Sequence, residues 1–295
     1  MTQATRPPIF LHCGFRSGST WFWHRFRRTR EAYAYYEPFH ETLASLRLDS
    51  LPTSAAEGPP HLRHPLLNAP YHAEYRALLR QTGGVPFYEL RMALLNYFDT
   101  GPDAAQLNYI ELLMRHAQDR NRVPLLGFCR SLGRVGWFRE YCPGINIVTL
   151  RAPWNRWMSY HRQTSVHGNS YFEFMAFSIA LIGRRHGRYR PCFAGLALPE
   201  LENRAGGDLG TRARNAFDAL DERERLRIFL RVFVLEMWIA TRHADHVVDL
   251  DRLGAEPAYC AAVTETLRAA SGLVHRFHET NHMQPIPLTP PHAVM

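Results

Sequence analysis

The chain of 295 residues contains no lysine, so all 35 of its basic side chains are arginines. This absence excludes chemistry that requires a lysine, such as Schiff-base formation and the phosphate-binding lysine of a Walker A loop. The simplest explanation of this composition is a GC-rich genome that replaces lysine with arginine. The formal charge of +8 nevertheless suits an anionic ligand.

Cysteine pairs and long apolar runs are missing as well. The five cysteines are odd in number, scattered and never spaced C-x-x-C, so neither a disulfide framework nor a zinc site is predicted. The apolar runs are shorter than the roughly 18 residues that a membrane-spanning helix needs. The apolar stretch that follows residues 1–8 is too short for a signal peptide. We therefore expect a cytoplasmic protein without a membrane span.

Apolar residues are plentiful: 46% of the chain is hydrophobic and 12% is aromatic, which is enough to bury a sizeable core. Because single cores stop growing at about 250 to 300 residues, this length favours one domain. We expect a single domain over residues 1–295, with its core at about 8–271 and an irregular C-terminal tail at 272–295.

Short apolar segments alternate with helical patterns along the chain. Strands are predicted at residues 8–14, 32–36, 123–129, 145–150 and 246–250, and helices after residue 20 and at 39–48, 71–81, 104–119, 135–141, 154–163 and 257–270. Residues 226–241 are apolar nearly all round, which predicts a helix buried inside the domain. Residues 51–70 form a predicted surface loop and residues 183–213 a mobile loop or lid. The alternation predicts an α/β fold with a central parallel sheet flanked by helices.

The strongest local motif is GFRSGSTW at residues 14–21, between a predicted strand and a predicted helix. Main-chain N–H groups at a helix N-terminus bind anions, the Ser and Thr hydroxyls add donors, and Gly18 allows a phosphate to approach closely. The spacing does not fit a Walker A loop. The motif therefore indicates an anion site, although a tight connection without a ligand would use the same residue types.

A second motif, RAPWNRWMS at residues 151–159, also joins a strand to a helix. Together the two motifs resemble the sulfotransferase family. In that family the first loop holds the 5′-phosphosulfate of 3′-phosphoadenosine 5′-phosphosulfate (PAPS). An R-x-P segment, with a Ser eight residues after its Arg, holds the 3′-phosphate, and Arg151 and Ser159 have that separation. The resemblance implies a P-loop NTPase-like sulfotransferase fold.

The resemblance also assigns roles within the first loop. Arg16 stands where many cytosolic members use a lysine to stabilise the leaving phosphate, and a guanidinium can bind sulfonate and phosphate oxygens bidentately. Trp21 would stack on the adenine. The 5′-phosphate cradle would be formed by Ser17, Gly18, Ser19 and Thr20.

The segment YYEPFH at residues 35–40 resembles the Y-E-P segment of carbohydrate sulfotransferases, which implies a sugar hydroxyl as acceptor. Glu37 would follow the second strand, at the edge where open α/β sheets place their ligands. A carboxylate there can accept the proton of the attacking hydroxyl. We therefore predict Glu37 as the general base, with His40 as the reserve candidate. A capping or salt-bridging role is the alternative for Glu37.

Further charged residues carry weaker predictions. Arg130 follows a buried strand and would contact the sulfonate or an anionic acceptor, or else form a surface ion pair. The basic run at residues 24–30 is expected to form a solvated helix face. The family's C-terminal clamp for the 3′-phosphate has no counterpart, which leaves residues 184–190 as a weak candidate. Two histidine groups lie in irregular segments and are not expected to bind a metal, namely His61, His64 and His72, and His275, His278 and His282.

These observations predict a PAPS-dependent sulfotransferase that acts on a hydroxyl of a carbohydrate or glycoconjugate without a metal. Its partners would be the nucleotide and the acceptor, with neither nucleic acid nor a membrane involved. Two alternatives remain. An ATP-dependent phosphotransferase could use the same loop, and a non-enzymatic module could bind polyanions through its arginines.

Overall fold

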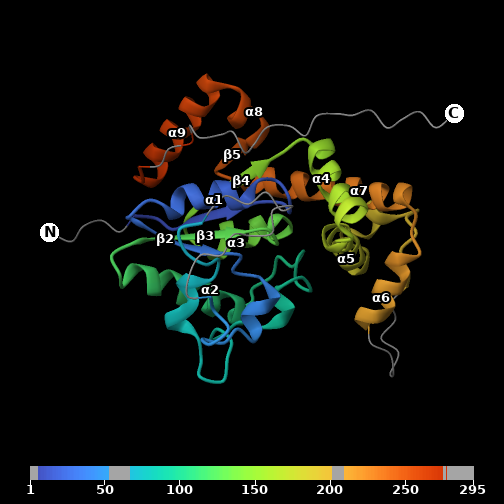
Figure 1. The fold of residues 1–295 in the computed structure, drawn as a ribbon, viewed down its shortest axis with the longest axis horizontal. Helices are drawn as coiled ribbons and strands as arrows, with labels where there is room; N and C mark the ends of the chain where they lie inside the picture. The colour runs from blue at the N-terminus through green and yellow to red at the C-terminus, as the bar shows by residue number, and fades with distance from the viewer. Residues whose placement is uncertain (1–5, 53–66, 201–208, 275–276, 278–295) are drawn as a thin grey trace.

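The computed structural model describes residues 6–52, 67–200, 209–274 and 277, and at its centre lies a five-stranded, all-parallel sheet (Figure 1). The strands lie in the order β2-β3-β1-β4-β5. They are β1 (Ile9–His12), β2 (Ala32–Tyr36), β3 (Val123–Phe128), β4 (Ile145–Leu150) and β5 (His246–Asp249). The predicted parallel sheet and the position of each strand are confirmed.

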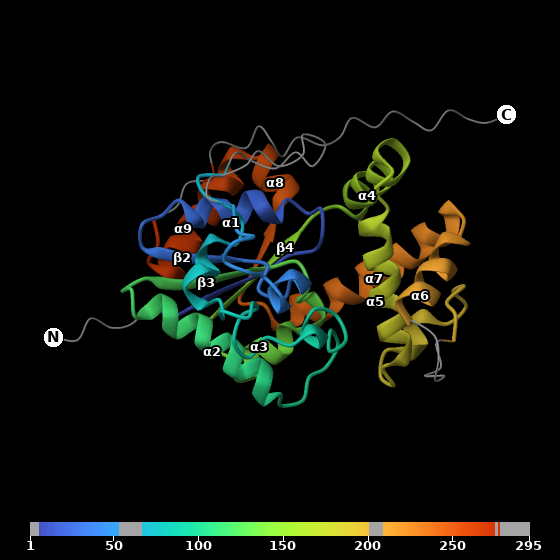
Figure 2. The same ribbon diagram turned by 60° about the horizontal axis from the view of Figure 1, so that its bottom comes forward.

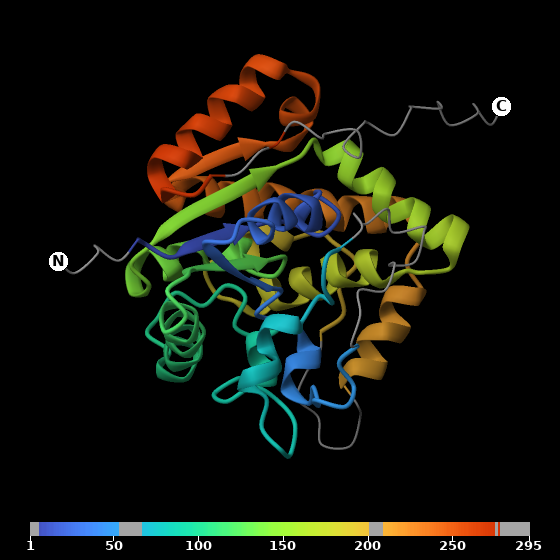
Figure 3. The ribbon, with the colours of Figure 1, turned by 60° about the vertical axis from the view of Figure 1, so that its left-hand side comes forward.

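Strand side chains alternate between two apolar layers because successive residues of a strand point to opposite faces. In β1, Ile9 and Leu11 belong to one buried cluster, whereas Phe10 belongs to another. The first layer is covered by α1 (Ser19–Arg27), α8 (Leu250–Ala255) and α9 (Pro257–Ser271), and the second by α2 (Ala104–Gln118) and α3 (Val135–Tyr141) (Figure 3). Both faces are therefore buried, as parallel sheets require.

The other helices stand together at one side of the sheet (Figure 2). They are α4 (Pro153–His167), α5 (Tyr171–Arg185), α6 (Leu209–Asp218) and α7 (Glu222–His243). Helices α5, α6 and α7 share a third apolar cluster, which contains Phe177, Phe217 and Leu235. No helix in the described part of the chain is long and apolar enough to cross a membrane.

Two predicted helices are short 3-10 turns in the structure. Residues 39–48 contain only Glu41–Ala44 in helical form, and residues 71–81 only Ala73–Leu78. Each turn buries a single residue, Leu43 in the first and Tyr75 in the second. In the first segment His40 is extended and Ser45 leaves the helical region, which confines the helical residues to Glu41–Ala44.

The prediction of a loop or lid at residues 183–213 is wrong at both ends. Helix α5 continues to Arg185, a 3-10 turn at Arg190–Phe193 packs on the third cluster, and α6 begins at Leu209. Residues 201–208 lie outside the described part. Helix α5 is absent from the predicted set, although Met175, Ile179 and Ile182 have helical spacing.

Helix α7 is present as predicted, but the prediction that it is buried on all sides is wrong. Leu230, Val234 and Trp238 form an outward row with exposed fractions of 40%, 64% and 43%. Its opposite side buries Val232 and Leu235 against α5 and α6. The helix lies at the outside of the molecule, so only one side of it meets other elements.

The basic run at residues 24–30 is only partly solvated. Arg27 is buried, and it donates to both carboxylate oxygens of Glu74 at 2.7 and 3.0 Å and to the carbonyls of Ala69 and Pro70. Burial lowers the pKa of His24 to about 4. The expected solvated face is therefore interrupted by residues 69–74, which pack against α1.

Candidate active site

The carboxyl ends of β1 and β4 form the topological switch point of the sheet, where the connections from neighbouring strands run to opposite sides. The chain leaves β1 toward β2 on one side, and it leaves β4 toward β5 on the other. In open α/β sheets the crevice at such a point is where ligands bind, because the two loops diverge there. Both predicted phosphate motifs follow these two strands.

The loop after β1 is held in an unusual main-chain conformation. Arg16 and Gly18 both have positive φ, 56° and 92°, and the Ser17 hydroxyl donates to the Gly14 carbonyl at 2.7 Å. A Cβ at Gly14 would lie 2.3 Å from the Arg156 guanidinium, so a larger residue there would force that guanidinium to move. Helix α1 then begins without a side-chain cap, and its N-terminal dipole favours an anion at this position.

The two motifs meet in space. The Arg16 Nε donates to the Ser159 Oγ at 3.0 Å, and the Arg151 Nη1 donates to the Arg16 carbonyl at 3.1 Å across 135 positions of the chain. Asp251 pairs with the Arg151 Nε at 3.4 Å. The structure therefore brings together three of the residues that the sequence assigned to the nucleotide, from two distant segments.

Trp21 does not offer an open ring face. Its side chain is 3% exposed, lies against Phe22 and Phe277, and carries the Arg25 guanidinium 5.0 Å from the ring centroid. The interpretation of Trp21 as an adenine platform is not supported by this arrangement. The reason is that the Trp21 indole is buried in the apolar layer between α1 and the sheet.

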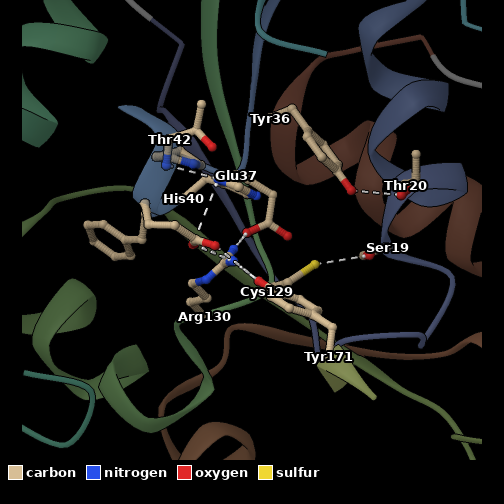
Figure 4. Close-up of polar contacts among 12 residues, drawn as sticks. Ser19, Thr20, Tyr36, Glu37, His40, Thr42, Cys129, Arg130 and Tyr171 are labelled. Atoms are coloured by element: carbon tan, nitrogen blue, oxygen red, sulfur yellow. Dashed lines mark hydrogen bonds and ion pairs between the residues drawn. The ribbon is translucent and has the colours of Figure 1, made fainter. Parts of the chain in front are cut away.

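The loop hydroxyls also contact the neighbouring strand ends (Figure 4). The Cys129 thiol donates to the Ser19 Oγ at 3.1 Å, and the Thr20 hydroxyl and the Tyr36 phenol share a hydrogen bond of 2.8 Å. A serine hydroxyl that accepts one bond keeps its own proton for another acceptor, such as a phosphate oxygen. The contacts tie the start of α1 to the ends of β2 and β3.

Glu37 follows β2 and is paired with Arg130. It has a positive φ of 47°, and its N–H donates to the Gly127 carbonyl at 2.7 Å. Its carboxylate, 5% exposed, accepts from the Arg130 Nη1 at 2.6 Å. Positive φ in a residue other than glycine is a strain that clusters at functional sites. The salt-bridging alternative for Glu37 is thus present in the structure.

Arg130 is placed differently from either prediction. It is 1% exposed, so it is no surface ion pair, and its Nη2 donates to Glu41 at 2.8 Å and to the Tyr171 hydroxyl at 2.5 Å. The guanidinium also lies over the Phe15 ring at 5.0 Å. Because its Nη groups are taken up by the protein, a direct contact with sulfonate or an anionic acceptor is not what this geometry offers.

His40 caps the 3-10 turn that follows. Its Nδ1 accepts from the Thr42 N–H at 3.2 Å (Figure 4). Burial and the charge of Arg130 lower the pKa of His40, which keeps the ring neutral near pH 7. A neutral ring that accepts at Nδ1 carries its proton at Nε2, so Nε2 is a donor and not a base.

A chain of buried hydrogen bonds lies beneath the loops that follow β1 and β3. The His12 Nδ1 accepts from the Ser131 hydroxyl at 2.7 Å, and its Nε2 donates to the Asn146 Oδ1 at 3.1 Å. Burial lowers the pKa of His12 to about 4. His12 directly precedes Cys13 in the loop after β1, and Ser131 directly follows Arg130 in the loop after β3. These hydrogen bonds therefore join the bases of the loops after β1 and β3.

Sequence reasoning missed two members of this site. Glu41 lies four residues after Glu37 in a segment that was already singled out, and that proximity is its signal. Tyr171 begins α5 and comes close only through the fold, so no local pattern points to it. Within the described ranges no group of three or more His, Cys, Asp or Glu residues is arranged to hold a metal. The predicted histidine groups lie outside those ranges except for His72.

Comparison of the chain with family models, curated proteins and solved structures finds no match. The fold and the residues at the carboxyl edge of the sheet therefore carry the functional conclusion.

Proposed function

We propose that the protein is a PAPS-dependent sulfotransferase, built on a P-loop-like sheet, that sulfates a hydroxyl of a carbohydrate or glycoconjugate. The observation that carries the proposal is the contact between the two predicted phosphate elements. Arg16, Arg151 and Ser159 converge beside the N-terminus of α1, at the topological switch point between β1 and β4.

The nucleotide would lie across these two elements. Its 5′-phosphosulfate would accept from main-chain N–H groups at the start of α1, from the Ser19 hydroxyl and from Arg16. Its 3′-phosphate would lie between Arg151 and Ser159. The residues fit a ligand with two separated anionic groups, because cationic and hydroxyl donors lie on both loops.

In the transfer step the acceptor oxygen attacks sulfur in line with the bond to the phosphate. A new S–O bond forms, the old S–O bond breaks, and its electron pair stays on the phosphate oxygen that Arg16 stabilises. The acceptor proton goes to Glu37. Glu37 is preferred to His40 because the His40 Nδ1 lone pair already accepts from Thr42. The ion pair with Arg130 fixes the Glu37 carboxylate in orientation.

Calorimetric titration with 3′-phosphoadenosine 5′-phosphate, ADP and ATP, with and without Mg²⁺, tests the nucleotide assignment. We expect metal-independent binding that needs the 3′-phosphate. A preference for ATP with Mg²⁺ would establish the phosphotransferase instead. Folded protein that binds no nucleotide but binds polyanions with steep salt dependence would establish the binding module.

Arg151→Ala tests which loop reads the 3′-phosphate. We expect about a thirtyfold loss of affinity for 3′-phosphoadenosine 5′-phosphate and little change for ADP, because a charge-assisted contact of about 2 kcal/mol is removed. Arg139→Ala is the matched control, since Arg139 is a half-exposed arginine on α3 that pairs with Asp245. Equal losses for both nucleotides would remove Arg151 from this role.

A further inference from the structure

The charged cluster beside the nucleotide loop contains one guanidinium and two carboxylates. Arg130 lies between Glu37 and Glu41, with N–O distances of 2.6 and 2.8 Å, and the Tyr171 hydroxyl completes the group (Figure 4). Glu37 and Arg130 follow β2 and β3. Glu41 begins the 3-10 turn Glu41–Ala44, and Tyr171 begins α5. Summed over Arg130, Glu37 and Glu41, the formal charge is negative.

Arg130 cannot lend its charge to an incoming ligand. The side chain is 1% exposed, one face lies over Phe15, and its Nη atoms donate to Glu37, Glu41 and Tyr171. Its Nε is also buried. An anionic acceptor would have to break the ion pairs to reach this guanidinium, which would leave the buried Glu37 uncompensated.

Glu41 is the accessible member of the three. Its side chain is 43% exposed, compared with 5% for Glu37. Burial opposes the charge of Glu41, but the positive charge of Arg130 outweighs it and lowers the pKa of this carboxyl. His40 itself is neutral near pH 7 because burial and Arg130 lower its pKa. The charge that faces an acceptor here is thus that of an ionised carboxylate.

We propose that the site accepts hydroxyl compounds that are uncharged or carry an ammonium group, and that Glu41 excludes acceptors with an anionic group near the reacting hydroxyl. The inference rests on the proposed sulfotransferase function and names its acceptor class. A carboxylate accepts hydrogen bonds from neighbouring hydroxyl or ammonium groups of the acceptor. The same carboxylate repels a carboxylate, sulfate or phosphate, and discrimination arises as much from this repulsion as from attraction.

The test compares three matched methyl glycosides: methyl glucoside, methyl glucosaminide and methyl glucuronide. With PAPS as donor, we expect the wild-type kcat/KM to be at least about tenfold higher for the neutral and amino sugars than for the uronate, from one partly screened charge. Glu41→Gln should reduce this ratio severalfold. Its affinity for 3′-phosphoadenosine 5′-phosphate should be unchanged.

Glu265→Gln is the matched control, because Glu265 is an exposed acid on α9 that pairs with Arg268. This variant should keep the wild-type ratio. A wild-type preference for the uronate, a ratio that Glu41→Gln does not alter, or no transfer to either favoured sugar by protein that binds the nucleotide would overturn the inference. Failure of wild-type protein to bind the nucleotide would instead overturn the proposed function, and the acceptor assignment with it.

Discussion

Two charged regions share one edge of the sheet and are organised in opposite ways. Beside β1 and β4, the Arg151 guanidinium donates to the main-chain carbonyl of Arg16, and Asp251 pairs with Arg151. Beside β2 and β3, the single guanidinium of Arg130 holds the carboxylates of Glu37 and Glu41. The first region carries two arginines on the loops that we propose bind the nucleotide, whereas the guanidinium of the second region is buried between carboxylates.

The difference teaches that an arginine at a strand end has no fixed role. Arg16 donates to the Ser159 hydroxyl of the other loop, and we propose that it binds the anionic nucleotide there. Arg130 is buried between carboxylates, where it orients them and is itself out of reach. Function at this edge follows from each arginine's partners.

The largest expected effect comes from Glu37→Gln, which removes the carboxylate that we propose accepts the proton of the attacking hydroxyl. We expect kcat for sulfate transfer to fall about a thousandfold, which corresponds to about 4 kcal/mol of barrier. Affinity for 3′-phosphoadenosine 5′-phosphate should stay within about twofold, because Glu37 lies on the other region. Steady-state kinetics and calorimetry measure the two quantities.

His40→Gln is the control for that prediction. Because the His40 Nδ1 accepts from Thr42, we expect less than about a tenfold fall in kcat. A Glu37→Gln variant with full turnover, or a larger loss for His40→Gln, would remove Glu37 as the base.

Arg130→Met tests whether Arg130 serves to compensate buried carboxylates, because it leaves Glu37 charged and buried without its partner. We expect the free energy of unfolding to fall by on the order of 4 kcal/mol, measured by denaturant titration of tryptophan fluorescence. The double variant Arg130→Met/Glu37→Gln should recover part of this loss, since no uncompensated charge remains. A loss below about 1 kcal/mol for the single variant would show that the pair is not buried as described.

The buried His12 beneath both loops predicts a pH dependence of stability. Burial lowers its pKa from 6.5 to about 4, so between these values the unfolded chain binds the proton more tightly than the folded one. Stability should therefore fall as pH decreases from 6.5 to 4, by about 3 kcal/mol from His12 alone. His24 and His72, whose pKa values burial lowers to about 4 and about 3, act in the same direction.

Unfolding free energies measured at pH 7 and pH 5 check this prediction. His12→Gln should weaken the pH dependence, because one buried group no longer takes up a proton on unfolding. Identical slopes for the variant and the wild type would show that His12 is not held neutral. If nucleotide binding is lost in the same pH range, the loss of stability at low pH lies at the loops beside His12.

Local patterns predicted the strands because their cause is local. Each strand needs apolar residues on both faces, and runs such as IFLH and INIVTL display that directly. Two of the predicted helices are only 3-10 turns, although residues 39–48 bury Phe39, Leu43 and Leu46 at helical spacing. Helix α7 shows the limit of composition, because apolar residues all round did not tell which side would meet α5.

The sequence by itself determined the α/β alternation, the strand-to-helix loop after β1 and the spacing of Arg151 and Ser159, because these depend on residues close together in the chain. Only the tertiary structure decided that Arg130 pairs with Glu37, 93 positions away, and that Trp21 is covered. Such contacts depend on which strands become neighbours. That choice follows from how the whole chain buries its apolar faces, and no local segment encodes it.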